Sequence, residues 1–137
     1  DYPYGVWMIR LNRVVIRTYD ASKAIGTYSQ GIRFGNLVYT SGQIPLNPKS
    51  GELISGDFKA EVHQVLNNLE GVLKRGGSSL QCAVKLTVFL TDLSYFAQVN
   101  EVFDGFFPGN PPARSAVQVS ALPMSARIEI EAIGFVE

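Results

Sequence analysis

Residues 57–77, DFKAEVHQVLNNLEGVLKRGG, carry the clearest structural signal in the chain. Their apolar side chains recur three and four residues apart, as on one face of a helix. Asp57 can cap the amino end of this helix, and Gly76 and Gly77 can end it. The stretch therefore predicts an amphipathic helix that covers a core with one apolar face, formed by Phe58, Val62, Val65, Leu66, Leu69, Val72 and Leu73.

Extended segments precede this helix. Residues 28–34 and 37–40 contain alternating apolar side chains and flank the pair Gly35-Asn36. Two extended runs around such a pair predict a hairpin with a two-residue turn. Residues 14–17 are short and β-branched, so we expect them to form a strand at an edge of the sheet or against another chain.

A second helix and three more strands follow. Thr91 and Asp92 open a stretch with apolar side chains at helical spacing, which Pro108 ends. Further strands are expected at residues 83–90, 116–120 and 127–133. This order of elements predicts an α+β fold in which two helices cover one face of a mixed sheet.

The strand expected at residues 127–133 alternates strictly between charged and apolar side chains. Arg127, Glu129 and Glu131 share one face, and the apolar side chains share the other. If the apolar face meets the helices, the charged face is turned to water, to a subunit interface or to a cleft. The sequence leaves these three possibilities open. The same uncovered face is expected to carry Tyr39, Lys85 and Thr87.

The segment Pro111-Pro112-Ala113-Arg114-Ser115 places one guanidinium behind two prolines, at the head of an apolar strand. Proline fixes its own φ and biases the residue before it toward an extended conformation, so the backbone that enters Arg114 has little freedom. A preset guanidinium suits a carboxylate or a phosphate ligand. An internal salt bridge is the structural alternative, and both interpretations stay open at this point.

The charge of the chain is balanced, with 12 Lys and Arg against 12 Asp and Glu. Because a neutral chain has no overall field that attracts nucleic acid or an anionic membrane, we expect neither as a partner. No apolar run approaches the roughly 20 residues of a transmembrane helix. The single cysteine, Cys82, and the single histidine, His63, offer no cluster of metal ligands. We expect Cys82 to be buried and His63 to lie at the solvent.

Residues 1–13 are expected to be an N-terminal extension, and residues 14–137 a single domain. A domain of this length can bury a core without disulfides. The extension fits a tag, a family-specific segment or the remnant of a transit peptide. We therefore expect a cytoplasmic location, or a mitochondrial or other organellar one if the extension is a transit remnant.

Five separated motifs resemble those of the reactive intermediate deaminase (Rid) family of YjgF-like proteins, in its RidA branch. The resemblance runs from about Val15 to the C-terminus. Each motif is weak alone, and together they are specific. They are residues 24–31 (AIGTYSQG), 40–45 (TSGQIP), 99–103 (VNEVF), 112–115 (PARS) and 128–133 (IEIEAI).

This resemblance implies a fold, an assembly and a reaction. The implied fold is chorismate-mutase-like, and the implied assembly is a homotrimer with the sheets inside, the helices outside and a site in each cleft between subunits. The implied activity is that of a 2-iminobutanoate/2-iminopropanoate deaminase. Such an enzyme hydrolyses reactive enamines and imines, such as 2-aminoacrylate, to 2-keto acids and ammonia, without a metal or an organic cofactor.

The matching motif positions also imply the site residues. Arg114 matches the arginine that binds the substrate carboxylate, and Glu129 matches the glutamate that orients water. Tyr28, Ser41 and Asn100 match residues that line the same cleft. We expect the Tyr28 hydroxyl to bind the reacting end of the substrate.

The chain departs from the family in two places. Ala116 stands where many relatives have a cysteine, so any role of that thiol is absent, whereas a backbone contact to the substrate at this position would remain. The residues before Val14 have no family counterpart. The resemblance therefore does not predict what residues 1–13 do.

Two other functions remain compatible with the family. A regulatory trimer that binds a small carboxylate without turning it over would use the same arginine. A ribonuclease or translation inhibitor would need a basic stripe, whereas the first helix mixes Lys59, Lys74 and Arg75 with Glu61 and Glu70. The deaminase is the function that we expect, and the carboxylate-binding protein is the first alternative.

Overall fold

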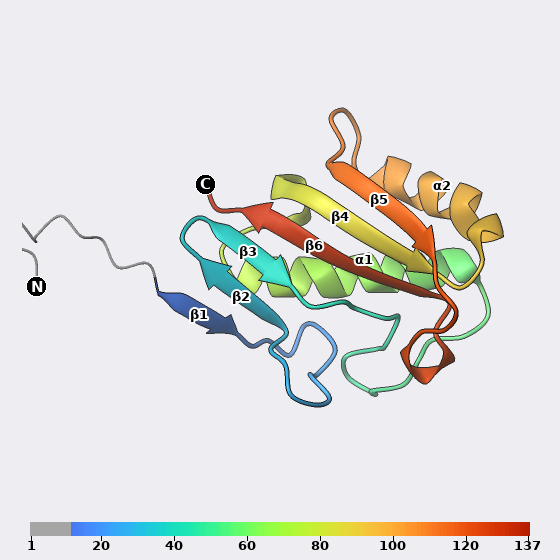
Figure 1. Cartoon of the computed structure of the whole chain (residues 1–137), viewed down its shortest axis with the longest axis horizontal. Coiled ribbons are helices and arrows are strands. Elements are labelled where there is room, and N and C mark those ends of the chain that lie inside the picture. Colours follow the sequence, from blue (N-terminus) through green and yellow to red (C-terminus); the bar gives the residue numbers. More distant parts are fainter. Residues whose placement is uncertain (1–11) are drawn as a thin grey trace, which may run out of the picture.

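Six strands form one mixed sheet in the structure, a computed structural model that describes residues 12–137 (Figure 1). Adjacent strands follow the order β1-β2-β3-β6-β4-β5. Strands β4 and β5 run parallel, and the other neighbouring pairs are antiparallel. The strands are β1 (Arg13–Ile16), β2 (Gly31–Phe34), β3 (Leu37–Thr40), β4 (Ala83–Leu90), β5 (Ala113–Gln118) and β6 (Ile128–Phe135).

Two helices, α1 (Phe58–Arg75) and α2 (Phe96–Phe106), pack on the same face of this sheet (Figure 1). Three 3-10 turns connect the longer elements: η2 (Leu80–Cys82), η3 (Leu93–Tyr95) and η4 (Pro123–Ser125). The core lies between the helices and the sheet. The predicted α+β architecture, with two helices on one face of a mixed sheet, is confirmed.

Helix α1 forms as its sequence predicts. The Asp57 side chain accepts a hydrogen bond from the Lys59 backbone N–H at 3.1 Å, and Gly76 ends the helix. The predicted apolar stripe is buried from Phe58 to Leu73. This burial supplies most of the helix's stability, because an isolated helix of this length is marginal in water.

Strand β6 keeps the alternation that the sequence predicts. Ile128 and Ile130 are fully buried beneath the helices, while Glu129 and Glu131 lie on the opposite face of the sheet. The hairpin is also confirmed, since Gly35, with a φ of 62°, and Asn36 join β2 to β3. A positive φ at this position suits glycine, which has no Cβ to clash.

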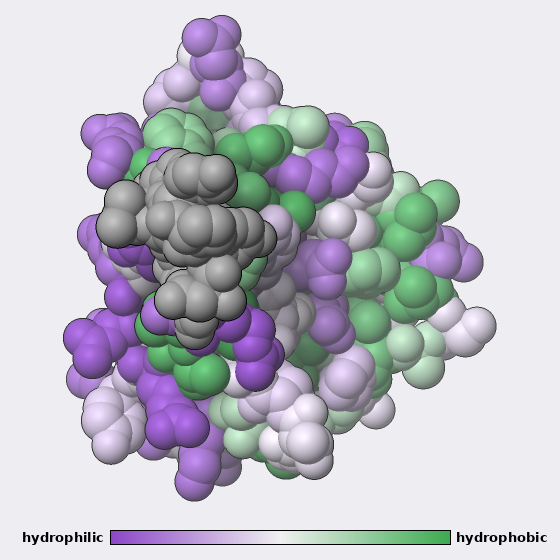
Figure 2. Space-filling view, turned by 60° about the vertical axis from the view of Figure 1, so that its left-hand side comes forward, coloured by the Kyte–Doolittle hydropathy of each residue, from purple (hydrophilic) through white to green (hydrophobic). Residues whose placement is uncertain are grey.

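The face of the sheet without helices is rich in apolar side chains. Cross-strand pairs place Ile32, Tyr39 and Ile133 in one row across β2, β3 and β6, and Leu37 pairs with Phe135 beside them. Tyr39 remains 41% exposed. Figure 2 shows apolar side chains gathered toward the right, the side to which this uncovered face is turned. Exposed apolar side chains that gather on one face in this way often mark an interaction site.

Several expectations about element boundaries are wrong. Strand β5 begins at Ala113 and not at residue 116, because pairing with β4 starts where Ala113 meets Lys85. Arg114 therefore lies inside the strand. The second helix is divided, since Asp92 caps η3 and α2 begins only at Phe96.

Two side chains also lie elsewhere than expected. Arg127 precedes β6 and turns to the helix side, where it binds Glu61 of α1, so it does not share a face with Glu129. Cys82 is only half-buried, because η2 ends at this residue near the C-terminal Glu137. The expected position of His63 at the solvent is confirmed. The expected extension, residues 1–13, lies outside the described residues except for Asn12 and Arg13, and Arg13 begins β1.

Candidate functional site

Tyr28, Ser41 and Glu129 line one open pocket of about 650 Å³ on the uncovered side of the sheet. The strand β6 supplies Glu129, the end of β3 leads into Ser41, and the loop before β2 supplies Tyr28. These three residues come from separate sequence motifs. The fold thus brings together half of the predicted site.

Gly42 makes room for the Glu129 carboxylate. A Cβ atom at this position would collide with the carboxylate of Glu129. The next residue, Gln43, forms an antiparallel bridge to Ile130, in which the backbone N–H of each donates to the carbonyl of the other. Segment 41–43 is therefore held against β6, and only a glycine allows the carboxylate to lie beneath it.

The carboxyl group of Glu129 has a shifted pKa. Burial raises the pKa of its carboxyl group above the usual value, and the nearby charge of Glu131 raises it further. Within residues 12–137, no Lys or Arg nitrogen lies within 4.0 Å of this carboxylate. A half-buried carboxylate without a cation binds a proton more readily than one in water.

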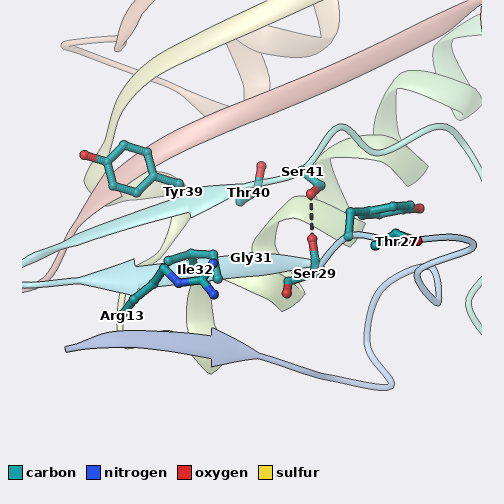
Figure 3. Close-up of a pocket in the computed structure, with 9 residues that line it drawn as sticks. Arg13, Thr27, Ser29, Gly31, Ile32, Tyr39, Thr40 and Ser41 are labelled. Carbon is teal, nitrogen blue, oxygen red and sulfur yellow. Dashed lines mark hydrogen bonds between the residues drawn. The ribbon is translucent and has the colours of Figure 1, made fainter.

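The two hydroxyls of the pocket are fixed by nearby backbone groups. The Ser41 hydroxyl donates to the Ser29 carbonyl at 2.6 Å, as Figure 3 shows. The Tyr28 hydroxyl accepts from the Ile25 backbone N–H at 3.2 Å and can still donate its own proton. Figure 3 shows the adjoining hollow, of about 480 Å³, which Arg13 and Tyr39 also line.

Arg114 lies in a different setting, at the edge strand β5. Its guanidinium donates to the Asn100 side-chain oxygen at 2.8 Å and lies over the rings of Phe96 and Phe103, at 5.0 Å and 5.3 Å from their centroids. Arg114 and Asn100 line a second pocket, of about 520 Å³, which also contains Asp104. These contacts fix the plane of the guanidinium without neutralising it.

The structural alternative for Arg114, an internal salt bridge, is wrong for the described part of the chain. Both ion pairs among residues 12–137 involve other residues, and Asp104 is not within 4.0 Å of the guanidinium. Ala116 follows two positions along β5 and shares the helix-side face with Arg114. Arg114, Asn100 and Ala116 thus form a second group.

The two groups lie on opposite faces of the sheet. Arg114 pairs with Leu86, which is fully buried under the helices. Glu129 pairs with Phe89, on the uncovered face. Strand β4 also separates β5 from β6. One chain therefore does not bring Arg114 and Glu129 to the same small ligand.

Sequence reasoning missed several residues around Glu129. Lys23, Ile25 and Met124 line the same pocket. Met124 and Ser125 have positive φ values of 56° and 58°, which are uncommon for residues other than glycine. The Leu-Pro-Met turn could have pointed to Met124, because it leads directly into the strand that carries Glu129.

Residues 12–137 hold no group of three or more His, Cys, Asp and Glu side chains arranged to bind a metal ion. In the same part of the chain, none of the helices is long and apolar enough to cross a membrane.

Comparison with known proteins gives a consistent family assignment. The sequence model of the family described as endoribonuclease L-PSP matches residues 18–136. A 2-iminobutanoate/2-iminopropanoate deaminase of Rattus norvegicus is 47% identical over 126 residues, which cover 92% of each chain. A RutC family protein of Pyrococcus horikoshii is 48% identical over 123 residues, which cover 90% of this chain and 98% of that protein.

A solved structure matches the fold closely. Escherichia coli TdcF with bound serine superimposes with a TM-score of 0.86 at 41% identity, and the match covers 90% of this chain and 99% of TdcF. The two relatives thus carry the names of a RutC family protein and of an imine deaminase, whereas the family model is described as an endoribonuclease.

Proposed function

The chain belongs to the Rid family of YjgF-like proteins, and on this premise we propose that it is a 2-iminobutanoate/2-iminopropanoate deaminase. It would hydrolyse short 2-imino acids, and the enamines that tautomerise to them, to 2-keto acids and ammonia. The observation that carries the proposal is the half-buried Glu129 carboxylate, which has a raised pKa and faces an open pocket beside the Tyr28 hydroxyl.

Glu129 supplies the proton transfers of this reaction. Its carboxylate removes a proton from water as the water oxygen bonds to C2 of the protonated imine, which gives a neutral carbinolamine. The carboxyl group then returns that proton to the amino nitrogen, and the C–N bond breaks to release ammonia. The proton of the remaining hydroxyl passes to the Glu129 carboxylate and from there to the ammonia, which leaves as ammonium and restores the carboxylate. The reaction needs no nucleophilic side chain, so a Ser-His-Asp arrangement is not required.

Arg114 and Tyr28 hold the substrate for this attack. The planar guanidinium of Arg114, whose Nη1 is already bound by Asn100, offers its remaining N–H groups to the substrate carboxylate. The Tyr28 hydroxyl can donate to the reacting end of the substrate. Correct positioning of water and substrate lowers the barrier by several of the roughly 7–11 kcal/mol that ideal orientation can supply.

A complete site requires two copies of the chain. The Arg114 group and the Glu129 group lie on opposite faces of one sheet, so a small substrate reaches both only where two chains meet. The uncovered, apolar face of the sheet is the surface that would bring the copies together. We therefore propose a homotrimer with a site between each pair of neighbouring subunits, in agreement with the family resemblance.

The first alternative is a protein that binds a small carboxylate without turning it over. The serine bound to TdcF supports this alternative, because serine is a small molecule with a carboxylate. A ribonuclease, which the family description names, has less support. The chain has no net charge, and its single histidine, His63, lies at the solvent on α1, outside both groups.

The release of ammonia and 2-keto acid from 2-iminopropanoate, generated in situ by an amino-acid oxidase, tests the proposal. The parent chain should accelerate release, and a folded Arg114→Met variant should not. Methionine keeps an unbranched apolar stem against Phe96 and Phe103 but removes the charge. Saturable binding of 2-oxobutanoate by the parent without ammonia release would contradict the deaminase and favour the carboxylate-binding alternative.

A further inference from the structure

The loop that carries Tyr28 is closed at its base by a buried amide. The Gln30 side chain, 6% exposed, accepts from the Thr18 backbone N–H at 2.8 Å and donates to the Thr18 carbonyl at 3.0 Å. It also donates to the Ser22 carbonyl at 2.8 Å. The Gln30 amide therefore binds both the N–H and the carbonyl of Thr18, as a paired strand residue would. Together with the bond to Ser22, these contacts hold residues 18 and 22 beside residue 30.

Ser22 lies in the same loop, between β1 and β2. It is bound by the side-chain amides of three residues, Gln30, Gln43 and Asn68. Its carbonyl is bound by Gln30, its N–H donates to the Gln43 side chain at 3.3 Å, and its hydroxyl accepts from Asn68 at 3.3 Å. Asn68 is fully buried on α1 and also donates to the Leu46 carbonyl at 2.9 Å. Each polar group of Ser22 thus has a fixed partner.

The same glutamine connects the loop to Ser41 through its backbone. The Gln30 carbonyl accepts from the Ser41 N–H at 2.9 Å, next to the Ser29 carbonyl that receives the Ser41 hydroxyl (Figure 3). Gln43 likewise leads from Ser22 to β6, where its backbone pairs with Ile130 beside Glu129. The network therefore links three parts of the chain that line the Glu129 pocket: the loop before β2, segment 41–43 and strand β6.

Burying a side-chain amide lowers the stability of a fold unless its polar atoms form hydrogen bonds, because these atoms lose their hydration. They do specify one arrangement, however, since the donors and acceptors match in only one register. Outside this network, the Ser22–Tyr28 segment is largely exposed, and Ile25 and Tyr28 project from it into the pocket. Few contacts other than the hydrogen bonds of Gln30 to Thr18 and Ser22 fix the position of this segment.

We infer that Gln30 is a positioning residue that sets the place of Tyr28 relative to Glu129, with Ser22, Gln43 and Asn68 as the groups through which it acts. This inference rests on the deaminase proposed above. Gln30 lines neither the Glu129 pocket nor the Arg114 pocket. Its effect on the reaction passes through the loop, so it should disappear when the Tyr28 hydroxyl is absent.

A double-mutant cycle tests this dependence. Gln30→Met, of similar length, removes the three side-chain hydrogen bonds and should lower kcat/KM about tenfold, since small misplacements in a site have large effects on rate. In a Tyr28→Phe background the same change should lower kcat/KM less than about twofold. Equal effects in both backgrounds, or none in either, would overturn the inference.

Ser78→Ala is the matched control. Ser78 is also buried and donates to a backbone carbonyl, that of Phe135 at 2.7 Å, but it lies outside the pocket. Its replacement should lower the melting temperature and leave kcat/KM unchanged at temperatures where the variant is folded. An equal loss of kcat/KM in Ser78→Ala would show that Gln30 acts only through stability. If Gln30→Met does not fold, the isosteric Gln30→Glu replaces it in the cycle.

Amide hydrogen exchange separates this inference from the deaminase proposal. Gln30→Met should speed exchange at residues 22–28 and weaken binding of 2-oxobutanoate, whether or not the parent releases ammonia. Unchanged exchange in this segment would contradict the inference even if the parent is an active deaminase. If Gln30→Met shows faster exchange and weaker binding but the parent releases no ammonia, the positioning role of Gln30 is supported and the deaminase proposal is rejected.

Discussion

Two arginines of this fold are stacked on aromatic rings in nearly the same way. The Arg114 guanidinium lies 5.0 Å and 5.3 Å from the centroids of Phe96 and Phe103. The Arg127 guanidinium lies 5.4 Å from each of Phe58 and Tyr95. Stacking alone therefore does not distinguish a structural arginine from one that binds a ligand.

The partners of the two guanidinium groups do distinguish them. Arg127 forms an ion pair with the buried Glu61 and donates to the Gly56 carbonyl at 2.9 Å, so its charge is used within the fold. Arg114 donates to Asn100, a neutral amide. The first arginine joins α1 to the start of β6, whereas the second forms no ion pair among residues 12–137.

The two carboxylates show the same contrast. Glu61 is buried and paired with Arg127. Glu129 is half-buried, has no cation within 4.0 Å among residues 12–137, and has a raised pKa. Arg127 and Glu61 thus pair with each other, whereas Arg114 and Glu129 have no partner of opposite charge within 4.0 Å among residues 12–137.

The largest effect is expected for Arg114→Met, which removes the unmatched cation. Loss of a charge-assisted contact to the substrate carboxylate should lower kcat/KM by about 100- to 1000-fold, or roughly 3–4 kcal/mol. The melting temperature should change little, because no ion pair of the fold is lost. Steady-state kinetics and thermal unfolding of the same sample measure both. If the Arg114→Met variant keeps the parental activity but has a much lower melting temperature, Arg114 is a structural residue, as Arg127 is.

The same substitution at the other arginine should have the opposite outcome. Arg127→Met leaves Glu61 buried without its partner, which should lower the free energy of unfolding by about 2–3 kcal/mol after allowance for the partial exposure of Arg127. Urea denaturation measures this loss. The double variant Arg127→Met/Glu61→Leu should recover much of it, since no charge is then left buried. If the double variant is as unstable as the single one, the ion pair is not the cause.

A smaller effect is expected for Arg114→Lys. Lysine keeps the charge but not the planar fork that binds a carboxylate with two N–H groups and stacks on Phe96 and Phe103. We expect kcat/KM to fall about tenfold, between the parent and the methionine variant. Activity equal to the parent would mean that charge alone, and not the held geometry, binds the substrate.

The smallest effect concerns stability at Glu129. Because its pKa is raised, the folded chain holds this proton more tightly than the unfolded chain does. This contribution to stability is present below the pKa of the unfolded carboxyl and is lost as the pH rises through the raised value. Glu129→Gln removes that loss, so the variant should be slightly more stable than the parent at neutral pH and nearly equal to it in acid.

Urea denaturation at a series of pH values checks this prediction. The difference in unfolding free energy between Glu129→Gln and the parent should grow as the pH rises. The matched change at the paired carboxylate, Glu61→Gln, should instead destabilise the chain at neutral pH, because Arg127 loses its partner. A Glu129→Gln variant that is less stable than the parent at neutral pH would mean that this carboxylate stabilises the fold.

The sequence predicts those parts of the fold whose signal is local. The helical stripe from Phe58 to Leu73, the Gly35-Asn36 turn and the alternation of Ile128, Glu129 and Ile130 each depend on side chains a few residues apart. The same alternation predicted that Glu129 lies on the face of the sheet opposite the helices, where the structure places it.

What the sequence could not predict depends on distant partners. Arg127 turns to the helix side because Glu61 lies there, and no local pattern links the two. Arg114 faces away from Glu129 because β5 pairs with β4 in a register that places Arg114 beside Leu86. The motif resemblance assigned both residues to one cleft but could not show that a single chain separates them. Likewise, the ties of Gln30 to Thr18 and Ser22 appear only in the folded loop.

The central claim is that the site combines Arg114 of one copy with Glu129 of another, and mixing two inactive variants tests it most directly. Arg114→Met and Glu129→Gln should each be inactive alone. After the two are unfolded together and refolded at equal amounts, about one quarter of the sites should contain both intact residues, so about a quarter of the parental activity should return. No recovered activity in mixed oligomers, confirmed by mass spectrometry, would contradict the account and place both residues in a site within one chain.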